Sequence, residues 1–460
     1  AVPDLHPPVD DPRFSVRSAP MKNDLFQLRV LVAIAAILVW VAVPAIAQGV
    51  SIPDADERAR CWPGKPDTDP RLCPPDDPRF PGRWEFGSTI PHEVHQSKMH
   101  PAERALGSIG LSVDRAWQRT TGRDDVVIAV LDSGIRWEYP DLVRKLYLNA
   151  GELPTPEGHD VHDANGDGRF DIDDYAGDTR VGDRNGNGLL DPGDLVRAFS
   201  DCIDDDGNGY PDDISGYDFF GGTHCGFTAG DNDAYDDTHF NHGTGIASTA
   251  AAETDNGLYD AGVCPDCRVL PVRVGDSFVV DANQFARGVV FSARSGAKVI
   301  ASALGAYNNT PSARFAVDFA YHNGVVLIAS AADEFSYHHN FPSVYNHALY
   351  VNSIRFNHTK DYRKASTFWG VNPCTNFGAR VWVTVPATSC SSGATSRLAG
   401  VAGLVASAAR DEGLGDLHTE EVYQLLRATA DDLDNREPDW GNLRYPAKPG
   451  FDQLYGYGRV

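Results

Sequence analysis

The chain has 460 residues, 42% of them hydrophobic and 23% charged, so it can bury a large core and has the composition of an ordinary globular protein. Its formal net charge is -24, and the segment from Asp160 to Asp237 holds 21 aspartates against 4 arginines. Such an acidic surface argues against nucleic acid as a partner, because nothing in it can neutralise phosphates, and it favours bound cations instead.

The N-terminal part of the chain has the pattern of a secretory leader. A positively charged start at Met21–Arg29 precedes an apolar run over residues 30–43 and the small-residue motif Ala45-Ile46-Ala47, which together are typical of a signal peptide. A membrane anchor is the alternative, but 14 residues are short for a span, so we expect no stable membrane anchor. We therefore expect a secreted protein, extracellular or periplasmic. The expected parts are upstream sequence (1–20), a signal peptide (21–47) and an N-terminal extension without a core of its own (48–106).

From about residue 107 onward, apolar strands alternate with helical segments. Continuous apolar strands are buried on both sides, which predicts an α/β fold for residues 107–460: a doubly wound, mostly parallel sheet with helices on both faces. Strand ends such as Asp132 and the loop after Ala331 then open on one edge, where such sheets place their sites. The expected strands are 126–131, 269–274, 299–304, 325–331, 348–354 and 380–385, and the expected helices are 245–251, 283–295, 312–322, 393–410 and 419–431.

Three separated fragments carry candidate catalytic side chains. An apolar strand runs into Asp132, His242 opens a helix of small residues, and Ser392 begins another such helix. Singly, these residues also fit a turn, a helix cap and an N-cap. Together they fit nucleophilic catalysis, because a serine hydroxyl needs an imidazole to take its proton and the imidazole needs a carboxylate to fix its tautomer. A helix N-terminus at the serine adds positive dipole where negative charge develops.

With these motifs, the region from about residue 107 to 460 resembles the subtilisin-like serine peptidases. Residues 126–134 resemble the family's aspartate motif, 242–247 its His-Gly-Thr-His-Val-Ala-Gly motif, and 299–305 the strand and turn of its primary specificity pocket. The resemblance implies a serine endopeptidase that hydrolyses peptide bonds of protein or peptide substrates through an acyl-enzyme. We expect it to be a monomer. The alternative function is a catalytically impaired extracellular calcium-binding protein that keeps the subtilase fold.

Two serines compete for the nucleophile position. Ser396 follows a threonine and so mimics the family's Gly-Thr-Ser. The small-residue run 399–402, however, matches the family's Ala-Gly-Val-Ala without a gap, and counting back from it places Ser392 at the nucleophile position. We therefore favour Ser392. Cys390 stands where the family has glycine, a departure that a bridge to Cys374 would accommodate.

Residues 331–334 align with the family's Ala-Gly-Asn-Glu, so Asp333 replaces the asparagine of the oxyanion hole. An ionised carboxylate cannot donate a hydrogen bond, and loss of that donor reduces turnover by on the order of 10²–10³. A protonated Asp333 can still donate. We expect reduced but real activity.

The insertion between Asp132 and His242 contains three loops with the spacing of calcium-binding loops. The 12-residue pattern places side-chain oxygens at positions 1, 3, 5, 9 and 12, glycine at position 6 and a backbone carbonyl at position 7. Aspartate at position 12 resembles dockerin-type and thrombospondin-type loops. The third loop ends in Ser215, so Asp213 is the candidate substitute. We expect two or three structural Ca²⁺ ions within residues 155–237; a solvated acidic insertion is the alternative. The predicted ligands are Asp163, Asn165, Asp167, Arg169, Asp171 and Asp174 in the first loop, Asp183, Asn185, Asn187, Leu189, Asp191 and Asp194 in the second, and Asp204, Asp206, Asn208, Tyr210 and Asp212 in the third.

The 8 cysteines are an even number, which fits an oxidising compartment. The segment 264–267 has the Cys-x-x-Cys spacing of half a zinc site, but no second pair lies nearby in the sequence, so a tight disulfide is favoured. The pairs suggested by proximity are Cys61 with Cys73, Cys202 with Cys225, Cys264 with Cys267, and Cys374 with Cys390.

Overall fold

The computed structural model describes residues 75–87, 110–226, 230–238, 241–306, 308–356, 369–433 and 449–460, all of which belong to one compact unit, residues 52–460. The predicted leader and the Cys61–Cys73 pair lie outside the described residues. Within the described part of the chain, no helix is both long and apolar enough to cross a membrane.

A sheet of eight strands forms the centre of the fold. Neighbouring strands follow the order β2-β3-β1-β4-β5-β6-β7, and β8 pairs with β6. Every strand pair is parallel except β6 with β7, so the predicted mostly parallel α/β sheet is confirmed. The strands are β1 (Val127–Asp132), β2 (Tyr217–Asp218), β3 (Arg268–Arg273), β4 (Val299–Ser302), β5 (Val326–Ser330), β6 (Leu349–Phe356), β7 (Trp369–Val371) and β8 (Val383–Pro386).

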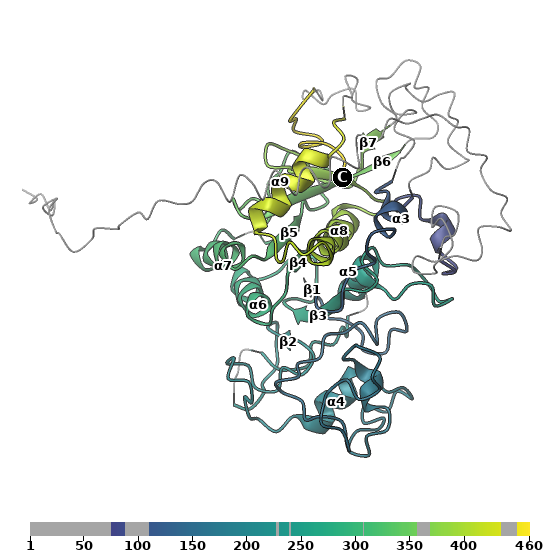
Figure 1. Ribbon diagram of the computed structural model, residues 1–460. Helices are drawn as coiled ribbons and strands as arrows, with labels where there is room; N and C mark the ends of the chain where they lie inside the picture. Colours follow the sequence, from purple (N-terminus) through teal and green to yellow (C-terminus); the bar gives the residue numbers. More distant parts are fainter. Residues whose placement is uncertain are drawn as a thin grey trace, which may run out of the picture. The chain divides into compact units, whose positions relative to one another are not determined.

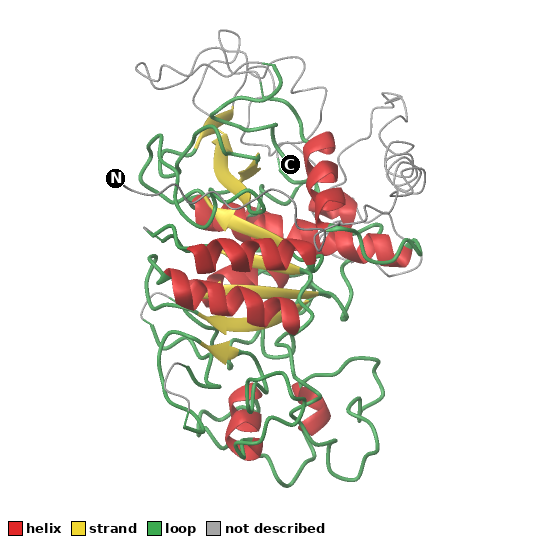
Figure 2. Ribbon diagram, turned by 90° about the vertical axis from the view of Figure 1, so that its left-hand side faces the viewer, coloured by secondary structure: helices red, strands yellow, loops and turns green. Residues whose placement is uncertain are grey.

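Helices cover both faces of the sheet because the side chains of each strand alternate between two cores. In β1, Ile128 and Val130 belong to one apolar cluster, whereas Ala129 and Leu131 belong to the other. The first cluster lies under α5 (His242–Ala251), α8 (Ser391–Asp411) and α9 (Thr419–Thr429). The second lies under α6 (Ala282–Arg294) and α7 (Pro311–His322). Figures 1 and 2 show the two helical layers with the strands between them.

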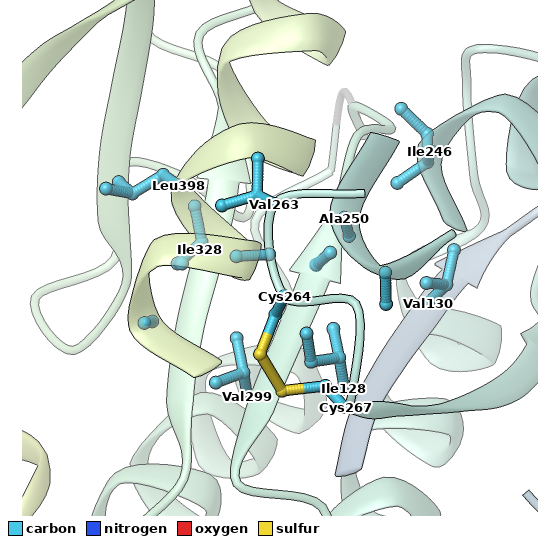
Figure 3. Close-up of a cluster of buried hydrophobic side chains, with 14 of the residues drawn as sticks. Ile128, Val130, Ile246, Ala250, Val263, Cys264, Cys267, Val299, Ile328 and Leu398 are labelled. Atoms are coloured by element: carbon cyan, nitrogen blue, oxygen red, sulfur yellow. A yellow bond between two sulfur atoms is a disulfide. The ribbon is translucent and has the colours of Figure 1, made fainter. Parts of the chain in front are cut away.

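Three disulfides join described residues: Cys202–Cys225, Cys264–Cys267 and Cys374–Cys390, each a predicted pair. Cys264 and Cys267 are fully buried in the first apolar cluster, beside Ile128 (Figure 3). A Cβ added to Gly403 of α8 would lie 2.9 Å from the Cys267 sulfur, so glycine lets the helix approach this disulfide. The two sulfurs are bonded to each other, which accounts for the Cys-x-x-Cys motif without zinc.

The acidic insertion is mostly loop, with two short helices, η5 (Ile172–Tyr175) and α4 (Pro192–Phe199). In Figure 1 its α4 region lies beyond β2, at the end of the sheet. It has a small apolar core of its own, formed by Leu148, Leu153, Ile172, Tyr175, Val181, Leu195 and Ile214. An insertion with so few apolar side chains buries little surface, so its loops need other stabilisation.

Residues 75–87, which fall inside the predicted N-terminal extension, pack into the first apolar cluster. This segment contains the short helix η3 (Phe80–Gly82). Phe86 is buried there against Trp117, next to α3 (Val113–Ala116). The Leu111 amide donates to the Glu85 carbonyl at 2.7 Å. The segment therefore contributes to the core of the sheet domain.

Candidate active site

The three candidate catalytic side chains meet at the carboxyl end of β1. Asp132 is the last residue of β1, His242 the first residue of α5 and Ser392 the second residue of α8. The Nδ1 atom of His242 lies 2.7 Å from Asp132 Oδ1, and its Nε2 atom lies 3.1 Å from Ser392 Oγ. An imidazole held between a carboxylate and a hydroxyl is the arrangement that activates a serine nucleophile.

Glycine allows α5 to begin this close to β1. A Cβ on Gly243 would lie 2.2 Å from the Gly134 carbonyl oxygen and 3.1 Å from the Asp132 Cβ. In the absence of that atom, the Gly243 amide donates to Ser133 Oγ at 3.0 Å. This contact anchors the N-terminus of α5 to the residue after Asp132, which fixes the position of the His242 ring.

The charge on His242 is set by competing effects. Burial is the largest effect and disfavours the imidazolium, but the carboxylates of Asp132, Asp333 and Asp236 together outweigh it and raise the pKa of His242 above its ordinary value. Asp132 is fully buried, and its Oδ2 atom has no hydrogen-bond partner among the described residues. The ring of Phe278 lies edge-on to the imidazole, with centroids 5.0 Å apart. The site thus stabilises the imidazolium that forms when the serine is deprotonated.

The geometry separates the two candidate serines. Ser392 is partly exposed, and its Oγ faces His242. Ser396 is buried, and its Oγ donates to the Gly393 carbonyl at 3.1 Å, a bond within α8 itself. The Ser396 hydroxyl is thus bonded within its own helix, whereas the Ser392 hydroxyl contacts the His242 imidazole.

Asp333 lies beside the serine turn. Its Oδ1 atom accepts hydrogen bonds from both the amide (3.0 Å) and the hydroxyl (2.5 Å) of Ser391, the residue before Ser392. Burial raises the pKa of the Asp333 carboxyl above its ordinary value, although these two bonds oppose the shift. Because Oδ1 is engaged as an acceptor, Oδ2 is the oxygen that remains to carry the proton when the Asp333 carboxyl is neutral.

A disulfide and an amide brace the approach to the same turn. Cys390, the N-cap residue of α8, is bonded to Cys374. Two residues before Cys374, Asn372 donates from Nδ2 to the Ser389 carbonyl at 2.8 Å. The backbone that leads to Ser392 is therefore cross-linked at Cys390, two residues before the serine.

The first two predicted calcium loops fold with the same hydrogen-bond pattern. Asp163 accepts from the amides of Gly166 and Gly168 at 2.8 and 3.0 Å, and Asp183 accepts from those of Gly186 and Gly188 at the same distances. The position-12 aspartates, Asp174 and Asp194, each accept from two amides near the start of their own loop. Both aspartates also complete a capping box with the position-9 residues, Asp171 and Asp191. Each loop therefore closes on itself through hydrogen bonds between its own aspartates and backbone amides, whereas the acidic groups close enough to hold an ion, among the described residues, lie at the third loop.

The third loop is built differently. The oxygens of Asp212, at position 9, accept from the amides of Asp201 and Cys202 and lie 2.6 Å from His224 Nε2. Asp212 thus holds the turn next to the Cys202–Cys225 disulfide. The hydroxyl of Ser215 donates to the Tyr147 carbonyl at 2.8 Å, outside the loop.

Other carboxylates lie at the third loop in place of Asp212 and Ser215. Asp213 accepts from the Asn208 side chain at 3.0 Å, and burial raises the pKa of Asp213 to about 8. Carboxylate oxygens of Glu152, Asp204 and Asp206 lie within 4.8 Å of one another, as in a site that can hold a cation. Sequence reasoning missed Glu152, because it lies 54 positions before Asp206, outside the 12-residue pattern.

A second group of buried carboxylates lies away from the insertion and was not predicted. Asp77 and Asp141 are both buried, and Asp77 Oδ1 has no hydrogen-bond partner among the described residues. Asn256 donates to Asp141 at 3.2 Å. Burial raises the pKa of Asp77 to about 6, with nearby Asp141 contributing. An unpaired buried carboxylate oxygen beside a second carboxylate suits a hard cation. The sequence carries no local signal for it, because its members come from three distant segments.

Comparison with known proteins assigns the family. The model of the subtilase family matches residues 123–458. The chain belongs to the subtilase family, whose members are serine peptidases. Its relatives include thermitase of Thermoactinomyces vulgaris, 31% identical over 47% of this chain and 77% of thermitase. The halolysin-like extracellular serine protease Nep of Natrialba magadii is 26% identical over 77% of this subtilase and 52% of Nep. A protease from Pseudoalteromonas arctica shares the fold, with a TM-score of 0.51 and 20% identity over 84% of this chain and 97% of that one.

Proposed function

We propose that this subtilase is a secreted, calcium-stabilised serine endopeptidase with Ser392 as nucleophile, His242 as general base and Asp132 as the carboxylate that orients it. The proposal rests on the position of the His242 ring, which lies 2.7 Å from Asp132 Oδ1 and 3.1 Å from Ser392 Oγ. As Ser392 Oγ attacks a peptide carbonyl, its proton moves to His242 Nε2. The imidazolium then protonates the leaving amine, and a water molecule, activated by the same ring, hydrolyses the acyl-enzyme.

The oxyanion is stabilised from two sides. The amide of Ser392, in the first turn of α8, has no acceptor within the helix and offers one donor. Asp333, when protonated on Oδ2, offers the second. Asp333 therefore acts as a conditional donor, present only while its carboxyl holds a proton.

Calcium supports the acidic insertion in this proposal. The matched first and second loops gather aspartates that repel one another without a cation. In the third loop, Glu152 and Asp213 supply carboxylate oxygens in place of Asp212, which bonds His224, and of Ser215, whose hydroxyl donates to Tyr147. Secretion is supported by the predicted leader at residues 21–47 and by the three disulfides, since disulfides persist in oxidising compartments.

The second candidate, a catalytically impaired calcium-binding protein, is favoured by one observation: Asp333 at the oxyanion position. Covalent labelling with a fluorophosphonate probe separates the two functions, because the probe reacts only with an activated serine. We expect calcium-loaded protein to be labelled, Ser392→Ala to abolish labelling and Ser396→Ala to retain it. Labelling lost in Ser396→Ala but kept in Ser392→Ala would reassign the nucleophile, and no labelling of the unaltered protein would favour the second function.

A further inference from the structure

Glu85 brings a buried carboxylate from the N-terminal segment to the serine turn of α8. The side chains of Glu85 and Arg397 are 0% and 3% exposed, and Arg397 Nη2 lies 2.7 Å from Glu85 Oε1. Thr388, four residues before Ser392, donates its hydroxyl to the same carboxylate oxygen at 3.0 Å. Glu85 therefore contacts two parts of the chain that flank the serine.

Arg397 extends this contact to the residue that follows the serine. Its Nη1 donates to the Gly393 carbonyl at 2.9 Å. A Cβ on Gly393 would lie 2.8 Å from the same Nη1 and 1.9 Å from Ser389 Oγ, so glycine leaves space for the guanidinium. One continuous network thus runs from Thr388 through Glu85 and Arg397 to Gly393, and its two ends lie on either side of Ser392 along the chain.

The network is stiff for physical reasons. Burial lowers the pKa of Arg397 and the Glu85 carboxylate opposes that shift, so the buried guanidinium charge is stabilised by pairing with a buried carboxylate. A guanidinium donates in a fixed planar fork, so the position of Glu85 determines where Arg397 can meet the Gly393 carbonyl. Gly393 lies in the first turn of α8, which also carries the Ser392 hydroxyl and the backbone amide proposed to bind the oxyanion. Small displacements of such groups strongly reduce turnover.

We propose that Glu85 is a positioning residue for Ser392, acting through Arg397 and Thr388 to hold the serine turn in its reactive position. The inference rests on the proposed function of Ser392. It gives residues 75–87, which the sequence places in an extension, a role in the catalytic rate in addition to their packing in the core.

The test compares Glu85→Gln with the unaltered, calcium-loaded protein. Glutamine keeps an acceptor oxygen but removes the charge that fixes Arg397. Activity is measured per fluorophosphonate-titrated site, so that loss of folded protein does not affect the result. We expect kcat and the rate of fluorophosphonate labelling to fall by about 10- to 100-fold, with KM changed by less than about twofold. A fall in kcat without a rise in KM is the result of a displaced nucleophile.

Arg79→Gln is the matched control, because Arg79 lies in the same segment, with its guanidinium 5.3 Å from the centre of the Tyr259 ring and 3.9 Å from Asp260. It should lower the unfolding temperature but leave kcat per titrated site unchanged. Thr388→Val is the second variant, because Thr388 is exposed and its replacement removes only one hydrogen bond to Glu85. If Glu85→Gln does not fold, this variant decides the test. A fall in kcat smaller than the one expected for Glu85→Gln supports the inference. Unchanged kcat in the folded Glu85 and Thr388 variants, or an equal fall in kcat in Arg79→Gln, overturns the inference. Failure to label the unaltered protein overturns the proposed function and this inference with it, whereas normal labelling rates in the Glu85 and Thr388 variants overturn the inference alone.

Discussion

Replacing Asp333 with asparagine should increase turnover, and the increase should depend on pH. Asparagine has the same shape, so its oxygen can keep accepting the two bonds from Ser391 at 3.0 and 2.5 Å. Its amide nitrogen then takes the place of Oδ2 and donates to the oxyanion at every pH. Where Asp333 is ionised, the gain in kcat should approach the value of one oxyanion donor, on the order of 10²–10³, or about 2.7–4 kcal/mol.

The pH dependence follows from two requirements that oppose each other. Catalysis needs Asp333 protonated, which low pH favours, and His242 neutral, which high pH favours. Asp333→Asn removes the first requirement, so the fall in rate on the alkaline side should disappear. It also removes a negative charge that helps raise the pKa of His242, so the acid limb of the profile should move to lower pH.

The assay is the pH profile of kcat and kcat/KM on a chromogenic peptide, normalised to titrated active sites. Asp236→Asn is the control, because Asp236 also raises the pKa of His242 but bonds Thr244 at 3.0 Å and not the serine turn. It should move the acid limb without raising turnover. An Asp333→Asn enzyme with unchanged or lower kcat at alkaline pH, or with an equal gain at every pH, would refute the reasoning.

Three further predictions concern the ions and the helix that carries His242. Chelation should lower the unfolding temperature, because an ion that binds only the folded state contributes about 2.7 kcal/mol to stability when its free concentration is 100 times its Kd. An unfolding temperature that the chelator does not change would contradict the calcium assignment. Glu152→Gln should reduce bound calcium by one ion, counted by calorimetric titration, while a loss of every ion would show that the loops are not independent. Gly243→Ala should reduce kcat by at least about 100-fold, because its Cβ would lie 2.2 Å from the Gly134 oxygen and displace α5. Gly245→Ala is its control, since nothing lies within 4 Å of that Cβ, and it should keep full activity and gain up to about 1 kcal/mol in helix stability. Full activity in Gly243→Ala would contradict the packing argument.

Local patterns determined much of this protein. The apolar run that ends in Asp132 predicted β1, because a strand buried on both faces admits no polar side chain until it emerges from the sheet. The regular spacing of aspartate, asparagine and glycine indicated two repeated loops, in which the hydrogen bonds from backbone amides to the carboxylates of the first and last aspartates join residues at most ten positions apart. An ungapped match along one helix likewise favoured Ser392 over Ser396.

Tertiary structure alone decided which distant side chains became neighbours. Glu85 meets Arg397 across 312 positions, and Glu152 meets the third loop across 54, so no window of sequence contains either contact. Within the third loop, the fold directs Ser215 to Tyr147 and Asp212 to the Cys202 turn, although the spacing assigned Asp212 to the ion. The physical reason is that a periodic pattern records only the interactions between residues close in the chain. The partner of a buried charge, in contrast, is chosen by whichever segments the sheet packs against it.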